Sequence, residues 1–170
     1  MIRVPMSLTI ALTIALASTH SLAVDPPSNS ISKPRTGTTR PFGSGTITQR
    51  SDGSHSTTRS FGSGSIITER DKYGRTVTGI TRPLGSGTIT RWSDGTTTHT
   101  RAFGSGWLTT ERDRGGKTIT GTTRPFGSGT ITSRSNGSSS TTRPFGSGTI
   151  TSDNPGRSST SATQEVAPAS

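Results

Sequence analysis

The sequence predicts an all-β chain, organised as an array of about five antiparallel β-hairpins. Three observations lead to this fold class: a tandem repeat, turn signals between β-prone segments, and no helical periodicity in the repeat region. The repeated motif is Arg-Pro-Phe-Gly-Ser-Gly or a close variant. Its copies begin 19, 23, 19, 23 and 19 residues apart, so a short and a long unit alternate. The copies begin at Arg40, Arg59, Arg82, Arg101, Arg124 and Arg143.

Composition leaves a disordered chain as the main alternative fold. Only 24% of the 170 residues are hydrophobic, while glycine, serine and threonine are abundant. This profile is close to that of disordered chains. Each hairpin offers roughly three large apolar side chains for burial, too few to offset the entropy of ordering it. An ordered array therefore requires neighbouring hairpins to pack together, or order that appears only on assembly.

The short units contain the strongest turn signal. They begin at Gly43, Gly85 and Gly127, and each opens with Gly-Ser-Gly-Thr-Ile-Thr. An Asp-Gly or Asn-Gly pair follows, which predicts a type I′ hairpin turn in which both central residues have positive φ. The β-branched residues on either side favour strands. The turn pairs are Asp52-Gly53, Asp94-Gly95 and Asn136-Gly137.

The long units begin at Gly62 and Gly104, and their turns span residues 71–74 and 113–116. The Phe-Gly-Ser-Gly segments are expected to form the turns at the opposite end of the array. Proline at 41, 83, 125 and 144 fits the entrance to such a turn. The aspartates of the other turns are expected to accept local hydrogen bonds from the backbone.

We divide the chain into a signal peptide (1–23), a Pro/Ser-rich linker (24–39), a β-hairpin repeat region (40–157) and a disordered tail (158–170). Arg3, an apolar run over residues 8–17 and Ser21-Leu22-Ala23 predict cleavage after Ala23. A membrane anchor is the alternative, but the apolar run is shorter than the roughly 20 residues of a spanning helix. No later segment is apolar enough for a transmembrane helix. The mature chain is therefore expected to be secreted, periplasmic or at the cell surface.

The charge points to acidic partners. The formal net charge is +10, and cysteine is absent, which excludes disulfides and thiolate metal sites. A chain this basic favours polyanions, here an acidic polysaccharide, lipopolysaccharide or extracellular nucleic acid. Self-association is a further possibility that the repeats leave open.

The six motif arginines, Arg40, Arg59, Arg82, Arg101, Arg124 and Arg143, are the candidate polyanion-binding residues. They hold one position relative to each turn, so a regular array places them in a row about 10 Å apart. Five phenylalanines lie two residues further along, where they are positioned to stack on guanidinium groups, bases or sugar rings. The alternative is a solvated arginine face, with the phenylalanines packed between hairpins. These phenylalanines are Phe42, Phe61, Phe103, Phe126 and Phe145.

Nothing in the sequence indicates an enzyme, a cofactor or a metal. The repeated Gly-Ser-Gly differs from the Gly-x-Ser-x-Gly of an esterase elbow, and its repetition is typical of a turn. His55 and His99 fall at different positions within their units, so no ligand position repeats. Glu69 and Glu111 each precede an arginine, and local charge balance explains them.

Two turn sequences resemble known repeat families. Residues 71–78 read Asp-Lys-Tyr-Gly-Arg-Thr-Val-Thr and resemble the hairpin core of RHS/YD repeats. Residues 113–120 match less closely, with Lys117 in place of the arginine. Gly-Ser-Gly-Thr-Ile-Thr with a downstream Asp-Gly is similar to part of the MORN repeat. The resemblances imply hairpin geometry and carry no function to this chain.

The expected function is that of an exported, non-enzymatic repeat protein that binds acidic polymers through the arginine row. The alternative is a structural or self-assembling protein of extracellular fibres or surfaces. A basic antimicrobial protein, or an ice-binding protein with Thr-x-Thr arrays, is less well supported. Binding that weakens steeply with salt distinguishes the first hypothesis from the others.

Overall fold

The computed structural model of the protein describes residues 34–155. The expected signal peptide (1–23), residues 24–33 of the expected linker and the expected tail (158–170) lie outside the described residues. Within residues 34–155, no helix is long and apolar enough to cross a membrane.

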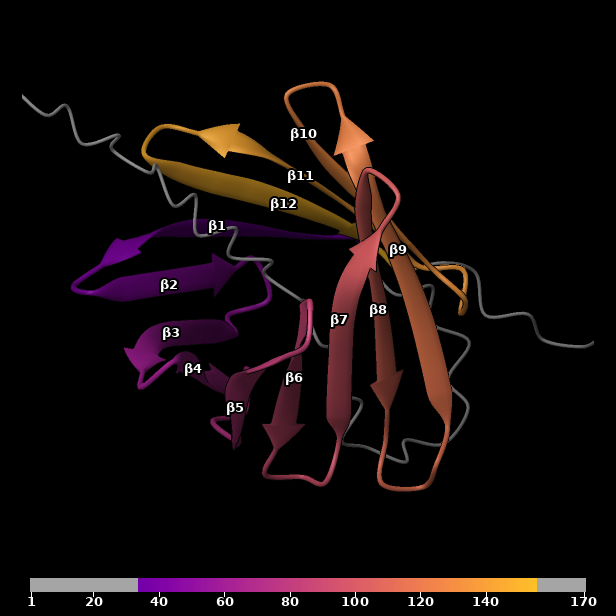
Figure 1. Cartoon of the computed structure of the whole chain (residues 1–170). Helices are drawn as coiled ribbons and strands as arrows, with labels where there is room; N and C mark the ends of the chain where they lie inside the picture. The colour runs from indigo at the N-terminus through magenta and orange to yellow at the C-terminus, as the bar shows by residue number, and fades with distance from the viewer. Residues whose placement is uncertain (1–33, 156–170) are drawn as a thin grey trace, which may run out of the picture. The chain divides into compact units, whose positions relative to one another are not determined.

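The described region is all-β, and its strands close into a barrel (Figure 1). Each strand pairs antiparallel with the next one along the chain, and the last described strand returns to pair with the first. The strands within residues 34–155 are β1 (Arg35–Phe42), β2 (Gly45–Arg50), β3 (His55–Phe61), β4 (Gly64–Arg70), β5 (Thr76–Leu84), β6 (Gly87–Trp92), β7 (Thr97–Phe103), β8 (Gly106–Arg112), β9 (Thr118–Phe126), β10 (Gly129–Arg134), β11 (Ser139–Phe145) and β12 (Gly148–Asn154).

The antiparallel hairpins agree with the sequence-based prediction, whereas closure into a barrel goes beyond it. An array of about ten strands leaves two open edges, and the barrel in residues 34–155 has none because β1 and β12 pair (Figure 1). The ordered repeats also begin earlier than expected. β1 starts at Arg35, so it takes in residues that the sequence assigned to the linker.

The closure between β1 and β12 completes one further long unit. The sequence of residues 36–42 in β1 is identical to that of residues 120–126, the second half of a long unit. In β1 and β12, Thr38 pairs with Ile150. In the unbroken long unit of β8 and β9, Thr122 pairs with Leu108 in the equivalent position. The barrel therefore consists of three short and three long units, and one long unit is split between the two ends of the described chain.

The Phe-Gly-Ser-Gly segments form tight turns at one end of the barrel, as the sequence predicted. In the first of them Phe42 pairs with Gly45, and the φ angle of Gly43 is 56°. Glycine with positive φ at the first central position is characteristic of a type II′ turn, whose twist matches that of the strands. Gly45 is required for a different reason, because a Cβ atom there would overlap the carbonyl oxygen of Thr58 on β3.

The loops at the opposite end are not the predicted type I′ turns. In the first short unit Gly53 has a φ of 86°, whereas no non-glycine residue in the described region has positive φ. Gly53 N–H donates to the Arg50 carbonyl, and Arg50 N–H donates to that of Ser54, both at 3.0 Å. This pattern is a type I turn followed by a left-handed glycine. The loop avoids the steric cost of positive φ at Asp52, which carries a Cβ atom.

A serine in each short loop holds the neighbouring long strand. Ser51 N–H donates to the Thr36 carbonyl at 2.8 Å, and Thr36 N–H donates to Ser51 Oγ at 3.1 Å. The same pair of bonds joins Ser93 to Thr78. The additional residues of the long units are thus hydrogen-bonded to the short loops, which explains how units of two lengths fit side by side. The third instance is Ser135 with Thr120.

Threonine lines the interior of the barrel, and the large apolar residues mostly face outward. Buried residues recur at every second position, as Thr98 and Thr100 do in β7, and the buried apolar side chains of the described region are Val77 and Trp92. The isoleucine of each Gly-Thr-Ile-Thr segment faces outward, in the register of the motif arginines. Pairs of inward hydroxyl groups share hydrogen bonds of 2.7–3.3 Å, joining Thr39 to Thr48, Thr81 to Thr90, Thr100 to Thr109, Thr123 to Thr132, and Thr142 to Thr151.

Candidate anion-binding surface

The motif arginines lie on the outer wall of the barrel, and the strand register sets their spacing. Arg40 on β1 pairs with Ile47 on β2, which pairs with Thr57 on β3. The next motif arginine, Arg59, lies two residues beyond Thr57 on the same strand. Each repeat therefore moves two strands across and two residues along. From the strand spacing and the rise per residue, successive arginines are about 12 Å apart.

The same step closes on itself around the barrel. Arg143 pairs with Ile150 on β12, and Ile150 pairs with Thr38 on β1, two residues before Arg40. The arginines therefore form a closed ring, where the sequence predicted a row. We call Arg40, Arg59, Arg82, Arg101, Arg124 and Arg143 the arginine ring.

Each member of the arginine ring is solvent-exposed and has an aliphatic cross-strand neighbour. All six are exposed, and among residues 34–155 none of them forms an ion pair. An unpaired guanidinium group keeps its hydrogen-bond donors available for an external anion. The aliphatic side chain beside it can pack against the methylene groups of the arginine. These neighbours are Ile47, Ile66, Ile89, Leu108, Ile131 and Ile150.

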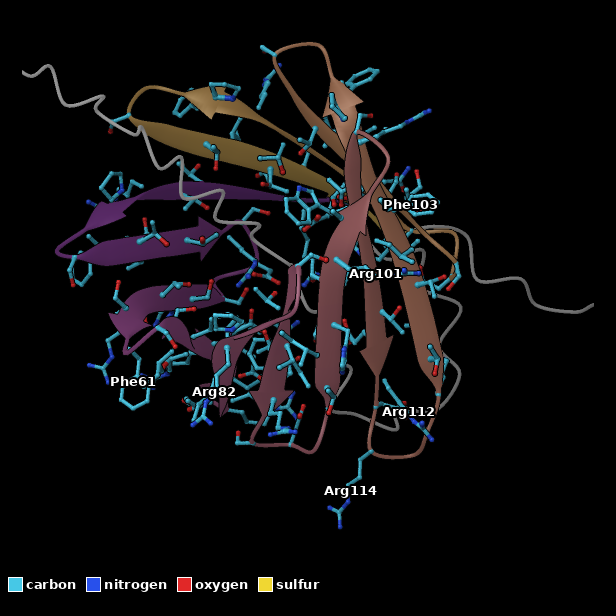
Figure 2. The ribbon with its side chains drawn as sticks, viewed as in Figure 1. Phe61, Arg82, Arg101, Phe103, Arg112 and Arg114 are labelled. Carbon is cyan, nitrogen blue, oxygen red and sulfur yellow. The ribbon has the colours of Figure 1, made fainter. Side chains whose placement is uncertain are left out.

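Large apolar side chains surround the same end of the barrel. We call Phe42, Phe61, Leu84, Phe103, Phe126 and Phe145 the apolar crown; their exposed fractions range from 51% for Leu84 to 59% for Phe145. They follow the ring arginines by two residues, so both groups face outward. In Figure 2, Phe103 lies beyond Arg101, towards the end of β7.

The exposure of the crown is inconsistent with phenylalanines packed between hairpins, the alternative that the sequence left open. Sequence reasoning also omitted one member, because the five candidates were chosen as aromatic residues. Leu84 occupies the same position in its repeat and is 51% exposed. Its place in the repeat was the signal that would have included it.

Acidic residues are kept away from the arginine ring. Four aspartates lie in the loops at the opposite end, and three further acids lie on inward-facing positions of their strands. Consequently, no acidic side chain within residues 34–155 is on the outer wall beside the ring. In Figure 2, Arg112 and Arg114 mark the opposite end, where both signs of charge occur. The acids are Asp52, Asp71, Asp94 and Asp113 in the loops, and Glu69, Glu111 and Asp153 inside.

The loop aspartates accept the local hydrogen bonds that the sequence predicted. Asp71 Oδ1 accepts from Tyr73 N–H and Arg75 N–H, both at 2.9 Å. Asp113 Oδ1 accepts from Lys117 N–H at 2.9 Å. Both aspartates therefore stabilise their turns.

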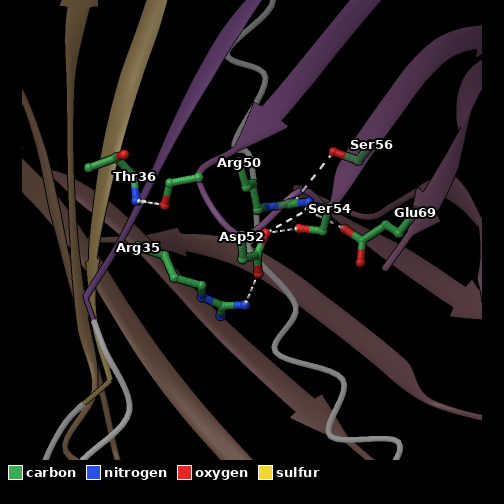
Figure 3. A network of polar contacts seen from close by, with 8 residues as sticks. Arg35, Thr36, Arg50, Asp52, Ser54, Ser56 and Glu69 are labelled. Atoms are coloured by element: carbon green, nitrogen blue, oxygen red, sulfur yellow. Dashed lines mark hydrogen bonds and ion pairs between the residues drawn. The ribbon is translucent and has the colours of Figure 1, made fainter. Parts of the chain in front are cut away.

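A polar network inside the barrel joins β1 to the first short loop (Figure 3). Arg35 Nη1 donates to Asp52 Oδ2 at 3.0 Å. Asp52 Oδ1 also accepts from the N–H and the hydroxyl of Ser54, at 2.9 and 2.6 Å. Burial raises the pKa of Asp52, but the hydrogen bonds from Ser54 and the charge of Arg35 outweigh it, so the pKa falls to about 2. The carboxylate therefore stays ionised and holds β1 near the closure.

Glu69 pairs with an arginine two strands away, and the expectation of local charge balance with the next residue is wrong for it. Arg50 Nη2 lies 3.7 Å from Glu69 Oε1 (Figure 3). Consecutive residues of a strand point to opposite faces, so Glu69 faces inward while Arg70 faces outward. Arg50 Nη2 also donates to Ser56 Oγ at 3.4 Å. The pair joins β2 to β4 across β3.

Asp153 on β12 has a buried carboxylate oxygen, Oδ1, without a hydrogen-bond partner in the described region. Burial raises its pKa, and the attraction of Arg134, Arg35 and Arg50 only partly offsets this. Asp153 occupies the repeat position of Glu69 with a side chain that is one methylene shorter. Deprotonation therefore destabilises the fold at this residue.

The described residues form no cluster of side chains that suggests catalysis or metal binding. No group of three or more His, Asp or Glu side chains within residues 34–155 could hold a metal ion. His55 on β3 and His99 on β7 lie on outward-facing positions of separate strands. The serines of the Gly-Ser-Gly turns are exposed at the tips. The arginine ring and the apolar crown are therefore the features of the described surface that suggest a ligand.

The fold and the surface define a closed antiparallel barrel of hairpin repeats with one cationic, apolar end. Comparison with protein-family models, with curated proteins and with solved structures found no match to this chain.

Proposed function

We propose that this protein is an exported, non-enzymatic binding protein for acidic polymers, which it engages through the arginine ring. The observation that carries the proposal is that the outer wall around the arginine ring has no acidic side chain among the described residues. Exposed, unpaired arginines encircle one end, and every acid of the described region lies in the opposite loops or inside. A cationic surface of this kind attracts polyanions and orients them before they bind.

The candidate partners share one chemistry. Acidic polysaccharides, lipopolysaccharide and nucleic acids carry repeated sulfate, carboxylate or phosphate groups, which guanidinium groups bind through paired N–H donors. A ring with about 12 Å between arginines allows one polymer to contact neighbouring members. Export rests on the N-terminal sequence.

The competing proposal of a self-assembling fibre has less support. Cross-β assembly uses unpaired strand edges. Every strand of the described barrel is paired on both sides, because β1 and β12 pair with each other. Assembly would have to use the outer wall or the ends.

Two charge-matched triple variants test the proposal. One replaces three ring positions: Arg40→Gln, Arg82→Gln and Arg124→Gln. The other replaces three exposed arginines at the opposite end: Arg70→Gln, Arg112→Gln and Arg114→Gln. Binding to heparin and to a short DNA duplex is measured as a function of salt.

The ring variant is expected to bind more weakly and to show a shallower salt dependence, by about one unit of slope for each phosphate that the variant no longer neutralises. The control variant is expected to stay close to the unmodified protein. Equal weakening in both variants would mean that total charge matters and the ring does not.

A further inference from the structure

The apolar crown has no clear use in binding a soluble polymer. It gathers six large apolar side chains, each more than half exposed, at one end of the barrel. The other exposed large apolar residues within residues 34–155 are Tyr73 and Ile80. Apolar surface concentrated in this way marks an interaction site. A soluble polyanion can occupy the guanidinium groups and still leave most of the crown in water.

Polarity changes in a defined order along the outer wall. The turn tips contain glycine and serine, the crown follows, and the arginine ring lies two residues further from the tip. Two residues of a strand span roughly 7 Å. Interfacial segments bury their apolar side chains about 5–10 Å into the boundary between lipid headgroups and acyl chains. The arginines, which lie farther from the turn tips than the crown, would then be at the depth of the lipid phosphates.

The register gives the crown and the arginine ring the same arrangement around the barrel. Each repeat moves two strands across and two residues along. Because six such steps return to the first strand, equivalent residues of the six repeats lie at the same height along the barrel axis. A ring at one level can bring all of its members to a flat surface together. We propose that this end of the barrel docks on an anionic phospholipid surface, with the crown in the headgroup–acyl boundary and the arginine ring on the phosphates. The inference rests on the proposed anion-binding role of the arginine ring and adds a lipid surface as a partner.

A second copy of the chain fits the crown less well. Two crowns placed face to face would bring two arginine rings close together, and no acid of the described outer wall lies beside them. Like charges brought together oppose association. An anionic phospholipid surface supplies the opposite charge and an apolar layer beneath it.

Vesicle flotation tests the docking. Binding is measured on vesicles of phosphatidylcholine alone and of phosphatidylcholine mixed with phosphatidylglycerol. The crown variant carries Phe42→Ser, Phe103→Ser and Phe145→Ser, and the control carries Tyr73→Ser and Ile80→Ser. All of these side chains are exposed, and thermal unfolding checks that each variant is folded.

The unmodified protein is expected to bind the mixed vesicles only. The crown variant is expected to bind them at least about tenfold more weakly while it retains heparin binding, and the control is expected to change neither. A crown variant that floats like the unmodified protein overturns the inference. If the ring variant loses heparin binding while the crown variant still floats with the vesicles, this inference alone fails. If the ring variant binds heparin as well as the unmodified protein does, the proposed function fails.

A second measurement tests the orientation. The chain has no cysteine, so one introduced cysteine labels one end. Ser105→Cys places an environment-sensitive fluorophore on a turn tip, and Gly115→Cys places it in the loop at the opposite end of β8. Mixed vesicles are expected to shift the emission to the blue at position 105 and to leave position 115 unchanged. Equal shifts at both positions, or a shift at position 115 alone, would contradict end-on docking.

Discussion

At the scale of single residues, the barrel interior uses small polar side chains and paired charges where most domains use apolar ones. The Thr39 and Thr48 hydroxyls satisfy each other at 2.7 Å, which removes the cost of burying two unpaired polar groups. Ile67 stands opposite Thr58 at the position where the equivalent pairs, Thr100 with Thr109 and Thr142 with Thr151, have two threonines, so the threonine pattern tolerates an apolar residue. Acids are costlier to bury, because a buried carboxylate requires a compensating partner.

Asp153 gives a prediction for the dependence of stability on pH. Its pKa is raised in the folded barrel by burial. The folded state therefore disfavours the carboxylate, and Asp153 lowers stability as the pH rises through its folded pKa. The Asp153→Asn variant is expected to melt at a higher temperature than the unmodified protein at pH 7. The difference in melting temperature is expected to disappear below pH 3.8, the ordinary pKa of the group, where Asp153 is protonated in both the folded and the unfolded chain.

Thermal unfolding followed by circular dichroism at pH 7 and pH 3 measures this effect. Asp113→Asn is the control, because Asp113 accepts a hydrogen bond from Lys117 N–H in its turn. The control is expected to give no stabilisation. An equal gain for Asp153→Asn at both pH values would show that the charge of Asp153 is not responsible.

At the scale of elements, each Phe-Gly-Ser-Gly turn needs its two glycines for different reasons. Gly104 has a φ of 58° and open space around it. Gly106 has no positive φ, but a Cβ atom there would overlap the Thr123 carbonyl of β9. The first glycine permits the turn, and the second permits the next hairpin to approach.

The two glycines are therefore expected to respond differently to alanine. Gly104→Ala should cost about 1–2 kcal/mol of unfolding free energy, because the strain is confined to one residue. Gly106→Ala should cost about 3 kcal/mol or more, because β9 must move. Chemical denaturation of both variants measures the difference. The reverse order would contradict the close approach of β8 and β9.

At the scale of the whole barrel, stability depends on the pairing of its two ends. Without β12, the β1 and β11 strands would present unpaired edges, which promote association between chains. Deletion of residues 147–170 is therefore expected to abolish cooperative unfolding and to cause aggregation. Deletion of residues 157–170 is the control, since it leaves every strand of the described barrel intact. Size-exclusion chromatography and thermal unfolding compare the two, and a monomeric, cooperatively unfolding chain without β12 would refute the role of closure.

Several features of the fold could be predicted from local chemistry. Glycine tolerates positive φ, and β-branched residues favour strands, so the sequence determined the positions of the turns, the antiparallel hairpins and the two unit lengths. The type of the Asp-Gly loop could not be inferred from the pair alone. It depends on the three-residue loop that joins Arg50 to Ser54.

The candidate site was only partly accessible from the sequence. Repetition identified the arginines and the phenylalanines, whereas the ring geometry required the pairing of strands that are distant in the chain. The sequence also did not reveal which face of each strand points into the barrel. In Thr-Ile-Thr either residue type can face inward, and the strand pairings place Thr48 inside and Ile47 outside.

What the sequence by itself determined is therefore local: turns, strands and the repeat that sets them in order. What only the tertiary structure decided is closure, the inward side of the sheet and the arrangement of charges around one end. The physical reason is that a strand has two faces and two edges, and which face is buried and which edge is paired depend on its neighbours. Here β12 and β1 provide the last pairing, and the repeated arginines become a ring.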